Sequence, residues 1–164
     1  MRKKIFFLVI IIIFILLASQ QKIFVLTEVG GKYEIVTSAR AEKNLPLEIN
    51  FTHSVQKTPV IEELEFDGEK FILIRTKYKS HGVGLPFMES DGEFREEDGY
   101  FIMDNMNRPI ENLSLRTGVG TNLTIKLDSE EIKLYEKYPA GTLIDFKVSS
   151  NLKMFFDKIF GRNF

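Results

Sequence analysis

Three pairs of turn-forming residues divide much of the chain into short, β-rich segments. Gly30-Gly31 separates KIFVLTEV from KYEIV, Asp67-Gly68 separates ELEF from EKFILIRTKY, and Asp98-Gly99 separates EFREE from YFIM. Such pairs tolerate the positive φ angles that two-residue hairpin turns require. The pattern therefore predicts three antiparallel hairpins, with a type I′ turn at Asp67-Gly68.

Further strand-like segments follow, with no long helical period between them. They are LSLRTGV (113–119), LTIKLD (123–128), EIKLYE (131–136) and GTLIDFKV (141–148). Short strands at this spacing predict a mainly β fold, either an antiparallel β-sandwich or a partly open barrel. Since no linker, repeat or low-complexity tract interrupts the sequence, residues 21–149 are expected to form one domain.

The first 20 residues differ from the rest of the chain. MRKK is basic, and the IFFLVIIIIFILLA that follows is an apolar run of about 14 residues, the length of a signal-peptide core and short for a full membrane span. Residues 1–20 are therefore expected to direct export, as a cleaved signal peptide or as a retained signal anchor helix. Ala18 is acceptable before a cleavage site, but Leu16 is bulky where a small side chain is preferred, which favours the anchor. A retained anchor would leave the domain in the periplasm or on the outer face of a cytoplasmic membrane.

Composition argues against several classes of function. The chain has no cysteine, which excludes disulfides, thiol nucleophiles and cysteine-ligated zinc. Beyond residue 4, 19 basic residues stand against 23 acidic ones, a net charge of −4, so nucleic acid is not an expected partner. No nucleophile with a base, paired carboxylates or nucleotide loop is recognisable, so neither an enzyme activity nor a cofactor is expected.

The last 15 residues, 150–164, are predicted to form a short amphipathic helix. Its apolar side chains recur at helical spacing and share one face: Leu152, Phe155, Phe156, Ile159 and Phe160. The helix could cover an open face of the sheet, or it could lie in the interface of a bilayer. A hydrophobic face alone does not distinguish the two arrangements.

Two polar residues occupy positions where strand alternation calls for apolar ones. In LEINFTHSV, His53 falls on the apolar face, and in VIEELEF, Glu62 does the same. A tight connection at QKTP would pair His53 with Glu62, and the Asp67-Gly68 hairpin would bring Arg75 to that face. We therefore predict a cluster of His53, Glu62 and Arg75. It would be either a polar pin that fixes strand register or a ligand pocket in which Arg75 holds an anion.

The remaining polar stretches give no metal site. His81 could join His53, but two histidines lack the third ligand that zinc needs. The acidic ESDGEFREED lacks the ligand spacing of a calcium loop. Gly82 and Gly84 in YKSHGVGLPF are more typical of a bend or bulge between strands than of a phosphate-binding loop.

Several motifs resemble, in their order, those of a bacterial family, domain of unknown function 1850 (DUF1850). The resemblance extends from about Lys22 to Val148 through FTHSVQKTPVIEELEF, YKSHGVGLP, DGYFIM, LSLRTGVGTNLTI and PAGTLIDFKV. The positions that correspond to family motifs are His53, Ser54, Thr58, Pro59, Val60, Glu62, Gly82, Gly84, Leu85, Pro86, Leu115, Arg116 and Gly118. The chain departs from the family pattern at His81, usually aromatic, and at Asn122, often histidine.

This resemblance implies a small exported or membrane-anchored protein encoded beside tripartite ATP-independent periplasmic (TRAP) transporters of the TAXI type. The family brings no established chemistry. The expected function is therefore a non-enzymatic accessory role at the membrane, exerted through contacts with a TAXI-type permease or its binding protein. The alternative is an exported β-module that binds a small ligand or an anion.

Overall fold

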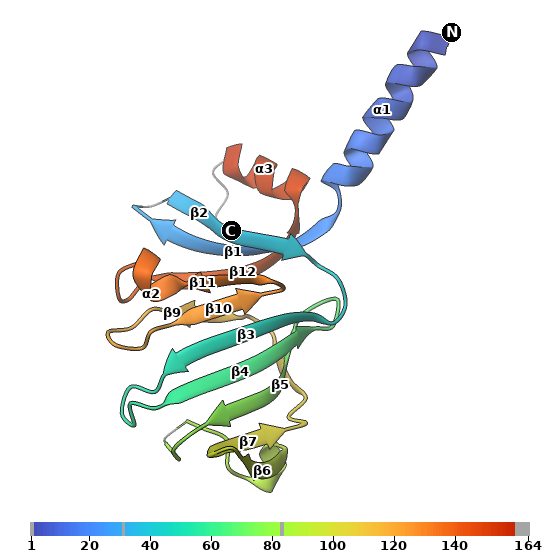
Figure 1. Ribbon diagram of the computed structural model, residues 1–164. Coiled ribbons are helices and arrows are strands. Elements are labelled where there is room, and N and C mark those ends of the chain that lie inside the picture. Colours follow the sequence, from blue (N-terminus) through green and yellow to red (C-terminus); the bar gives the residue numbers. More distant parts are fainter. Residues whose placement is uncertain (1, 31, 83, 160–164) are drawn as a thin grey trace.

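The protein folds into two antiparallel β-sheets with an N-terminal helix that stands away from them (Figure 1). The structure, a computed structural model, describes residues 2–30, 32–82 and 84–159. The smaller sheet has the strand order β2-β1-β12-β9. Its strands are β1 (Gln21–Val29), β2 (Lys32–Arg40), β9 (Ser114–Arg116) and β12 (Leu143–Ser150). The predicted mainly β, antiparallel architecture is confirmed.

The larger sheet has the order β11-β10-β3-β4-β5-β7-β6, and β8 pairs with β5 beside β7. Its strands are β3 (Leu45–Thr52), β4 (Pro59–Phe66), β5 (Phe71–Tyr78), β6 (Glu93–Glu97), β7 (Tyr100–Asp104), β8 (Arg108–Ile110), β10 (Thr124–Leu127) and β11 (Glu130–Lys133). A short 3-10 helix, η1 (Glu89–Asp91), precedes β6, and a four-residue helix, α2 (Leu134–Lys137), follows β11. The predicted strand 131–136 therefore ends early, because Leu134 enters the core from a helical turn.

One hydrophobic core joins the two sheets. Alternate residues of β3, Leu47 and Ile49, are buried in one cluster with Ile23 and Val25 of β1. Both faces of β1 are covered, because Phe24 and Leu26 belong to a second apolar cluster on its outer side. The shared core supports the sandwich alternative of the predicted fold.

The three turn signals form hairpins, although one has a different loop. Asp98 and Gly99, with φ angles of 51° and 73°, make a two-residue turn between β6 and β7. Phe66 pairs with Phe71, so the Asp67-Gly68 hairpin has a four-residue loop and not the predicted two-residue turn. The Asp67 side chain closes this loop by accepting the N–H groups of residues 69 and 70. The hairpin of β1 and β2 turns at Gly30, while Gly31 lies outside the described residues.

The N-terminal segment forms helix α1 (Arg2–Ala18), which stands away from the sheets (Figure 1). Its large apolar side chains from Ile5 to Phe14, and Leu16, are between 46% and 69% exposed. Within residues 2–30, 32–82 and 84–159, no helix combines the length and the apolar character needed to cross a membrane. A membrane-spanning anchor is therefore not supported.

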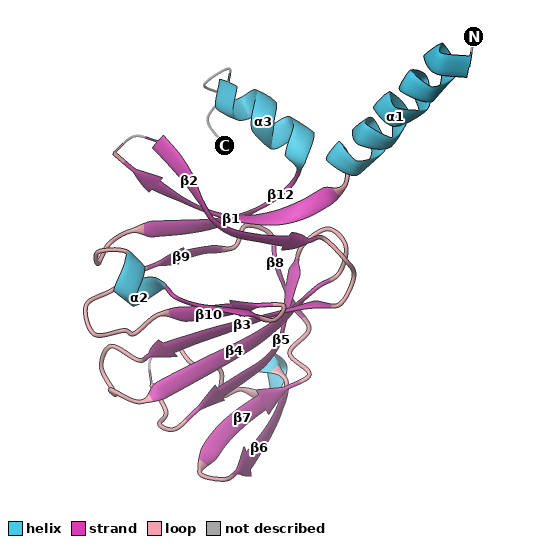
Figure 2. Ribbon diagram, turned by 45° about the horizontal axis from the view of Figure 1, so that its top comes forward, coloured by secondary structure: helices cyan, strands magenta, loops and turns pink. Residues whose placement is uncertain are grey.

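The C-terminal segment forms helix α3 (Asn151–Ile159), and Phe160 of the predicted apolar face lies outside the described residues. Figures 1 and 2 both show α3 beside the four-stranded sheet, at the end of the molecule from which α1 emerges. The β6–β7 hairpin lies at the opposite end.

Candidate functional site

His53 follows the last residue of β3 and organises the loop that leads to β4. Its backbone N–H donates to the Thr58 carbonyl oxygen at 2.9 Å, and its carbonyl oxygen accepts the N–H of Lys57, also at 2.9 Å. The ring Nδ1 accepts the N–H groups of Val55 and Gln56, at 3.2 and 3.1 Å. Since an Nδ1 that accepts hydrogen bonds bears no proton, the neutral ring carries its proton on Nε2.

The His53 ring packs against Gly82, the first glycine of the Gly-x-Gly-Leu-Pro motif. A Cβ atom at Gly82 would lie 3.0 Å from Nε2 and 3.1 Å from Cε1 of this ring. Gly84 has a different reason to be glycine, because its φ of 88° is unfavourable for other residues. Leu85 closes the turn with an N–H bond to the Gly82 carbonyl oxygen at 3.2 Å. The predicted bend is therefore present, and the first motif glycine makes room for the motif histidine.

A stack of aromatic rings lies beside this turn. The ring centroids of His81 and Phe101 are 4.3 Å apart, and the two ring planes are inclined by 24°. Phe94 stacks on Phe101 with a centroid distance of 5.9 Å. Buried Tyr78 meets His81 edge-on, and its hydroxyl donates to the Pro86 carbonyl oxygen at 2.5 Å. Burial raises the pKa of the Tyr78 hydroxyl, and the negative charge of Asp91 raises this pKa further. Tyr78 therefore remains a hydrogen-bond donor at neutral pH.

A cavity of ≈ 720 Å³, here named the aromatic pocket, opens against this stack. Its lining residues are Gln56, His81, Gly82, Leu85, Phe87 and Phe94. Its volume lies within the range typical of binding pockets. Phe87 and Phe94 remain 66% and 51% exposed, so two aromatic rings face solvent at its rim. The sequence pattern marks His81 as a candidate metal ligand at a position that is usually aromatic in the family, but it does not predict this pocket.

Glu62 lies on the inward side of the sheet, as predicted, but away from His53. The ladder pairs Glu62 with Ile49, whereas His53, four residues later in the chain than Ile49, bonds through its backbone to Thr58. Glu62 lines a cavity of ≈ 170 Å³ together with Arg116, and five other residues complete the lining, namely Ile49, Phe51, Leu115, Thr121 and Leu123. Burial raises the pKa of the Glu62 carboxyl, and the charge of Arg108 lowers it by less.

Arg75 faces the other side of the sheet because the ladder between β4 and β5 contains a bulge. Leu64 pairs with Leu73, but Glu63 pairs with Arg75, so one extra residue of β5 lies between the two pairs. An extra residue reverses the faces of all residues beyond it, so Arg75 points outward and Thr76 becomes buried. The structure therefore does not bring His53, Glu62 and Arg75 together as a cluster.

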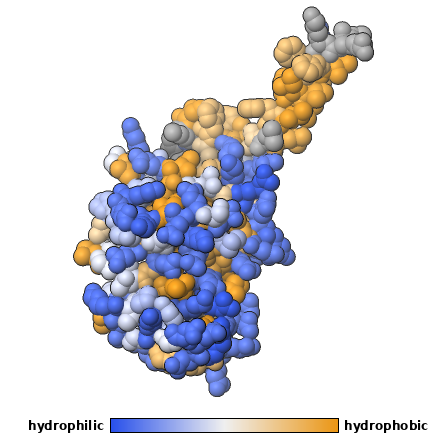
Figure 3. Space-filling model, viewed as in Figure 1, coloured by the Kyte–Doolittle hydropathy of each residue, from blue (hydrophilic) through white to orange (hydrophobic). Residues whose placement is uncertain are grey.

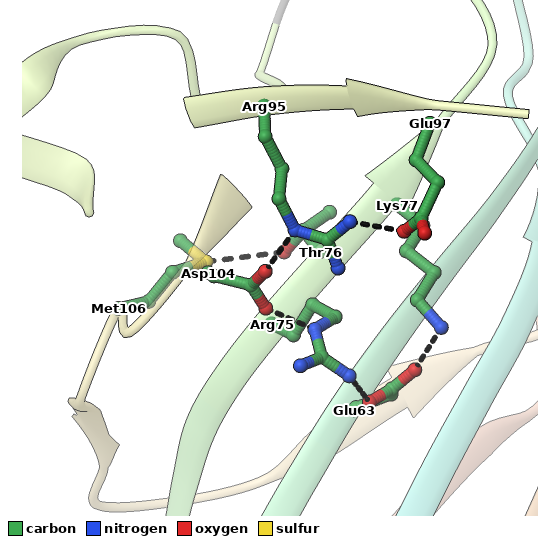
Figure 4. Close-up of polar contacts among 8 residues, drawn as sticks. All are labelled: Glu63, Arg75, Thr76, Lys77, Arg95, Glu97, Asp104 and Met106. Carbon is green, nitrogen blue, oxygen red and sulfur yellow. Dashed lines mark hydrogen bonds and ion pairs between the residues drawn. The ribbon is translucent and has the colours of Figure 1, made fainter. Parts of the chain in front are cut away.

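On the outer face, Arg75 belongs to a network of ion pairs across four strands (Figure 4). Arg75 donates to Glu63 at 2.8 Å and to Asp104, whose second oxygen accepts Arg95 Nε at 2.6 Å. Lys77 pairs with Glu63, and Arg95 pairs with Glu97, so the network joins β4, β5, β7 and β6. With two carboxylates bound to its guanidinium, Arg75 is better suited to pin these strands than to hold an anion.

The motif residues Arg116 and Gly118 stabilise the loop after β9. Arg116 donates to the Gly141 carbonyl oxygen at 2.6 Å. A Cβ atom at Gly118 would lie 2.7 Å from Cγ2 of Thr121, whose carbonyl oxygen accepts the Thr52 N–H at 2.6 Å. These contacts tie the loop to β3, directly before His53.

The motif residues Ser54, Pro59 and Val60 lie in or next to the turn at His53. Val60 is buried in one cluster with Tyr78 and Leu85, Pro59 begins β4, and Ser54 is exposed in the loop. Among the residues that the structure describes, no three histidine, aspartate or glutamate side chains are placed to hold a metal ion.

The structure thus defines a two-sheet antiparallel β-domain with an aromatic pocket formed mainly by the loop after β5 and by β6, with Gln56 of the β3–β4 loop at its wall. The chain belongs to the family described as domain of unknown function (DUF1850), whose model matches residues 47–134. This range contains the aromatic pocket but is narrower than the resemblance from Lys22 to Val148, because β1, β2 and β12 lie outside it. No curated protein and no solved structure matches the chain.

Gly82→Ala tests the contact between the two motifs. The added methyl group meets the His53 ring, so we expect thermal unfolding of the full-length protein in detergent to show a loss of about 1–3 kcal/mol. In a His53→Ala background the ring is absent, and the same substitution should cost much less. Equal losses in both backgrounds would show that the ring is not the obstacle.

Asp104→Asn tests the outer network. Burial alone would raise the pKa of Asp104, but hydrogen bonds from Arg75 and Arg95 hold this pKa below its usual value of 3.8. The carboxylate therefore stabilises the fold above pH 3.8, and this contribution is lost as pH falls through the lower folded-state pKa. We expect the variant to be about 1 kcal/mol less stable at pH 7, and the difference to vanish in acid. Glu97→Gln, at the exposed edge of the network, is the control and should change little; a loss independent of pH would contradict the account.

Glu62→Gln tests the partly buried carboxyl. Because its pKa is raised in the folded state, the unfolded chain ionises first, and stability falls as pH rises above the ordinary value of 4.5. Glutamine does not ionise, so we expect the melting temperature at pH 7.5 to rise by about 2–4 °C, with no gain below pH 4.5. Glu65→Gln, at an exposed position of β4, is the matched control and should show no gain. A lower melting temperature for Glu62→Gln at pH 7.5 would mean that the carboxylate has a stabilising partner.

Proposed function

We propose that this protein is a non-enzymatic accessory domain, attached to a membrane and exposed outside the cytoplasm, that binds a protein partner through the aromatic pocket. The observation that carries the proposal is the exposed apolar rim of that pocket. Phe87 and Phe94 of the rim are each more than half exposed, as is Met88 next to Phe87 in the chain. Exposed apolar patches mark interaction sites, and aromatic residues dominate the binding energy of protein interfaces.

The position of the pocket in the family also supports a binding role. The pocket is built on Gly82 and Leu85, which correspond to family motif positions, and on the turn shaped by His53. It lies within residues 47–134, the part of the chain that matches the family model. The pocket therefore belongs to the shared domain, whereas α1 and α3 lie outside it.

Helix α1 supports attachment to a membrane. Apolar side chains occupy its whole circumference, and those from Ile5 to Phe14 are exposed in the structure. Helices that are apolar all round are covered either by protein or by lipid. Attached to a membrane through these side chains, α1 would keep the domain beside other membrane proteins, and such a tether raises the effective concentration of a weak partner.

The resemblance of the motifs suggests which partner to look for. It points to a TAXI-type TRAP permease or to the binding protein of that system. Both would be accessible to a domain attached to the outer face of the membrane. The mild acidity of the domain and its mostly apolar pocket argue against nucleic acid as the partner.

A second candidate is the binding of a small ligand in the cavity beside Glu62. The specific observation is a carboxyl with a raised pKa that shares this cavity with Arg116. Its volume of ≈ 170 Å³ is below the roughly 300–1,000 Å³ of typical ligand pockets. Arg75, the predicted anion-binding residue, is paired with Glu63 and Asp104 on the opposite face. The ligand-binding alternative therefore ranks second.

Affinity purification of the tagged, full-length protein from its native membranes in mild detergent, with mass spectrometry, tests the proposal. We expect a TAXI-type permease or its binding protein to co-purify. Phe87→Ser should remove it, because the substitution deletes an exposed ring from the rim without disturbing the core. Val29→Ser, at an exposed position of similar character in the smaller sheet, should retain it. Loss of the partner with both variants, or with neither, would contradict binding through the aromatic pocket.

A further inference from the structure

Helix α3 contacts the domain through the side opposite to its apolar face. Met154 is only 7% exposed and packs against Phe24 and Leu26 on the outer side of β1, with Tyr33 beside them. At about 100° per residue, Met154 lies on the other side of the helix from Leu152. The face that the sequence marks as apolar is therefore not the face that docks on the sheet.

The apolar face of α3 instead points away from the sheet. Its described members, Leu152, Phe155, Phe156 and Ile159, here named the outer stripe, are 39% to 59% exposed. An amphipathic helix that served as a lid would turn this stripe inward to bury it. The observed orientation presents four large apolar side chains to the surroundings of the domain.

The space beneath α3 also indicates that the apolar face of this helix does not pack on the sheet. A groove of ≈ 550 Å³ lies between α3 and the smaller sheet, with apolar side chains such as Phe24, Leu26 and Ile35 along it. The outer stripe could fill this groove but, apart from Phe155 at its edge, does not line it. Helix α3 is thus not a well-packed cover of the sheet.

Helices α1 and α3 leave the domain at the same point. Gln21 at the start of β1 pairs with Ser150 at the end of β12. Helix α1 ends at Ala18 and α3 begins at Asn151, so each helix lies within a few residues of this pair. In Figure 3 the apolar surface of α1 continues into an apolar area at this end of the domain. A membrane or protein surface that binds α1 would therefore lie next to the outer stripe.

Basic groups flank this end of the molecule. Lys22 follows Gln21 in β1, and Lys153 of α3 is well exposed, with a long contact of 3.8 Å to Asp157. Lysines next to an apolar surface favour the anionic headgroups of a lipid bilayer. Aromatic rings such as Phe155 are also found at the level of the interface.

We propose that α3 lies in the interface of the lipid bilayer with the outer stripe against the acyl chains. This inference rests on the membrane attachment in the proposed function and adds a second point of contact to α1. Two contacts fix the orientation of the domain, with the smaller sheet toward the membrane. The β6–β7 end, which carries the ring of Phe94 in the aromatic pocket, then points away from the lipid surface.

The absence of tryptophan from the sequence allows a direct test. Phe155→Trp places a single fluorophore in the outer stripe, and Ile159→Trp is a second reporter in case the first perturbs the fold. Full-length protein is reconstituted into vesicles of phosphatidylcholine and phosphatidylglycerol, with or without bromine on the acyl chains. We expect blue-shifted emission and loss of most of the fluorescence in the brominated vesicles. Phe94→Trp, of similar exposure at the far end, is the matched control and should not be quenched.

Flotation of the same vesicles separates this inference from the attachment itself. If the protein floats but neither stripe tryptophan is quenched, α3 does not lie in the bilayer and the inference is overturned, while attachment by α1 stands. Blue-shifted emission without quenching would mean that protein covers the stripe, which also overturns it. If the protein does not float, both the membrane attachment and the position of α3 in the bilayer are overturned.

Discussion

A single extra residue in β5 decides what both faces of the larger sheet can do. Without this bulge, strand alternation would place Arg75 among the core residues, where an unpaired charge is costly. With it, Arg75 and Lys77 point outward to Glu63 and Asp104, while Thr76 and Tyr78 turn inward. The outer ion-pair network and the aromatic pocket thus depend on the same local irregularity.

On the inner face of the sheet, the bulge allows the aromatic pocket to form. Tyr78, turned into the core, holds the carbonyl oxygen of Pro86 and supports the ring of His81. The turn after His81 passes over the His53 ring, and a Cβ atom at position 82 would crowd that ring. A packed, hydrogen-bonded base therefore presents two exposed aromatic rings, which is an arrangement suited to binding a partner. The proposal of an accessory domain rests on those exposed rings and, at the other end, on the apolar helix α1 and the outer stripe of α3.

The sequence predicts the class of fold and the hairpins well, because turn residues and alternation are local signals. Alternation also assigns Glu62 to the inward side of β4. Register is not local: the loop after His53 and the bulge before Arg75 each moved a residue out of the predicted cluster. The aromatic pocket combines rings from β6 and the loop after β5, with Phe101 of β7 stacked against His81, so it becomes visible only when the strands pair. Likewise, the helical period shows that residues of α3 share a face, but not that Met154 on the other side would dock.

The most direct measurement is site-specific photo-crosslinking in native membranes, with p-benzoylphenylalanine in place of Phe94 in the full-length protein. The account predicts a covalent adduct with a TAXI-type permease or its binding protein. The same photo-reactive residue in place of Val29, on the smaller sheet, should give no such adduct. Adducts of equal yield from both positions, or none from position 94, would contradict a partner-binding role for the aromatic pocket.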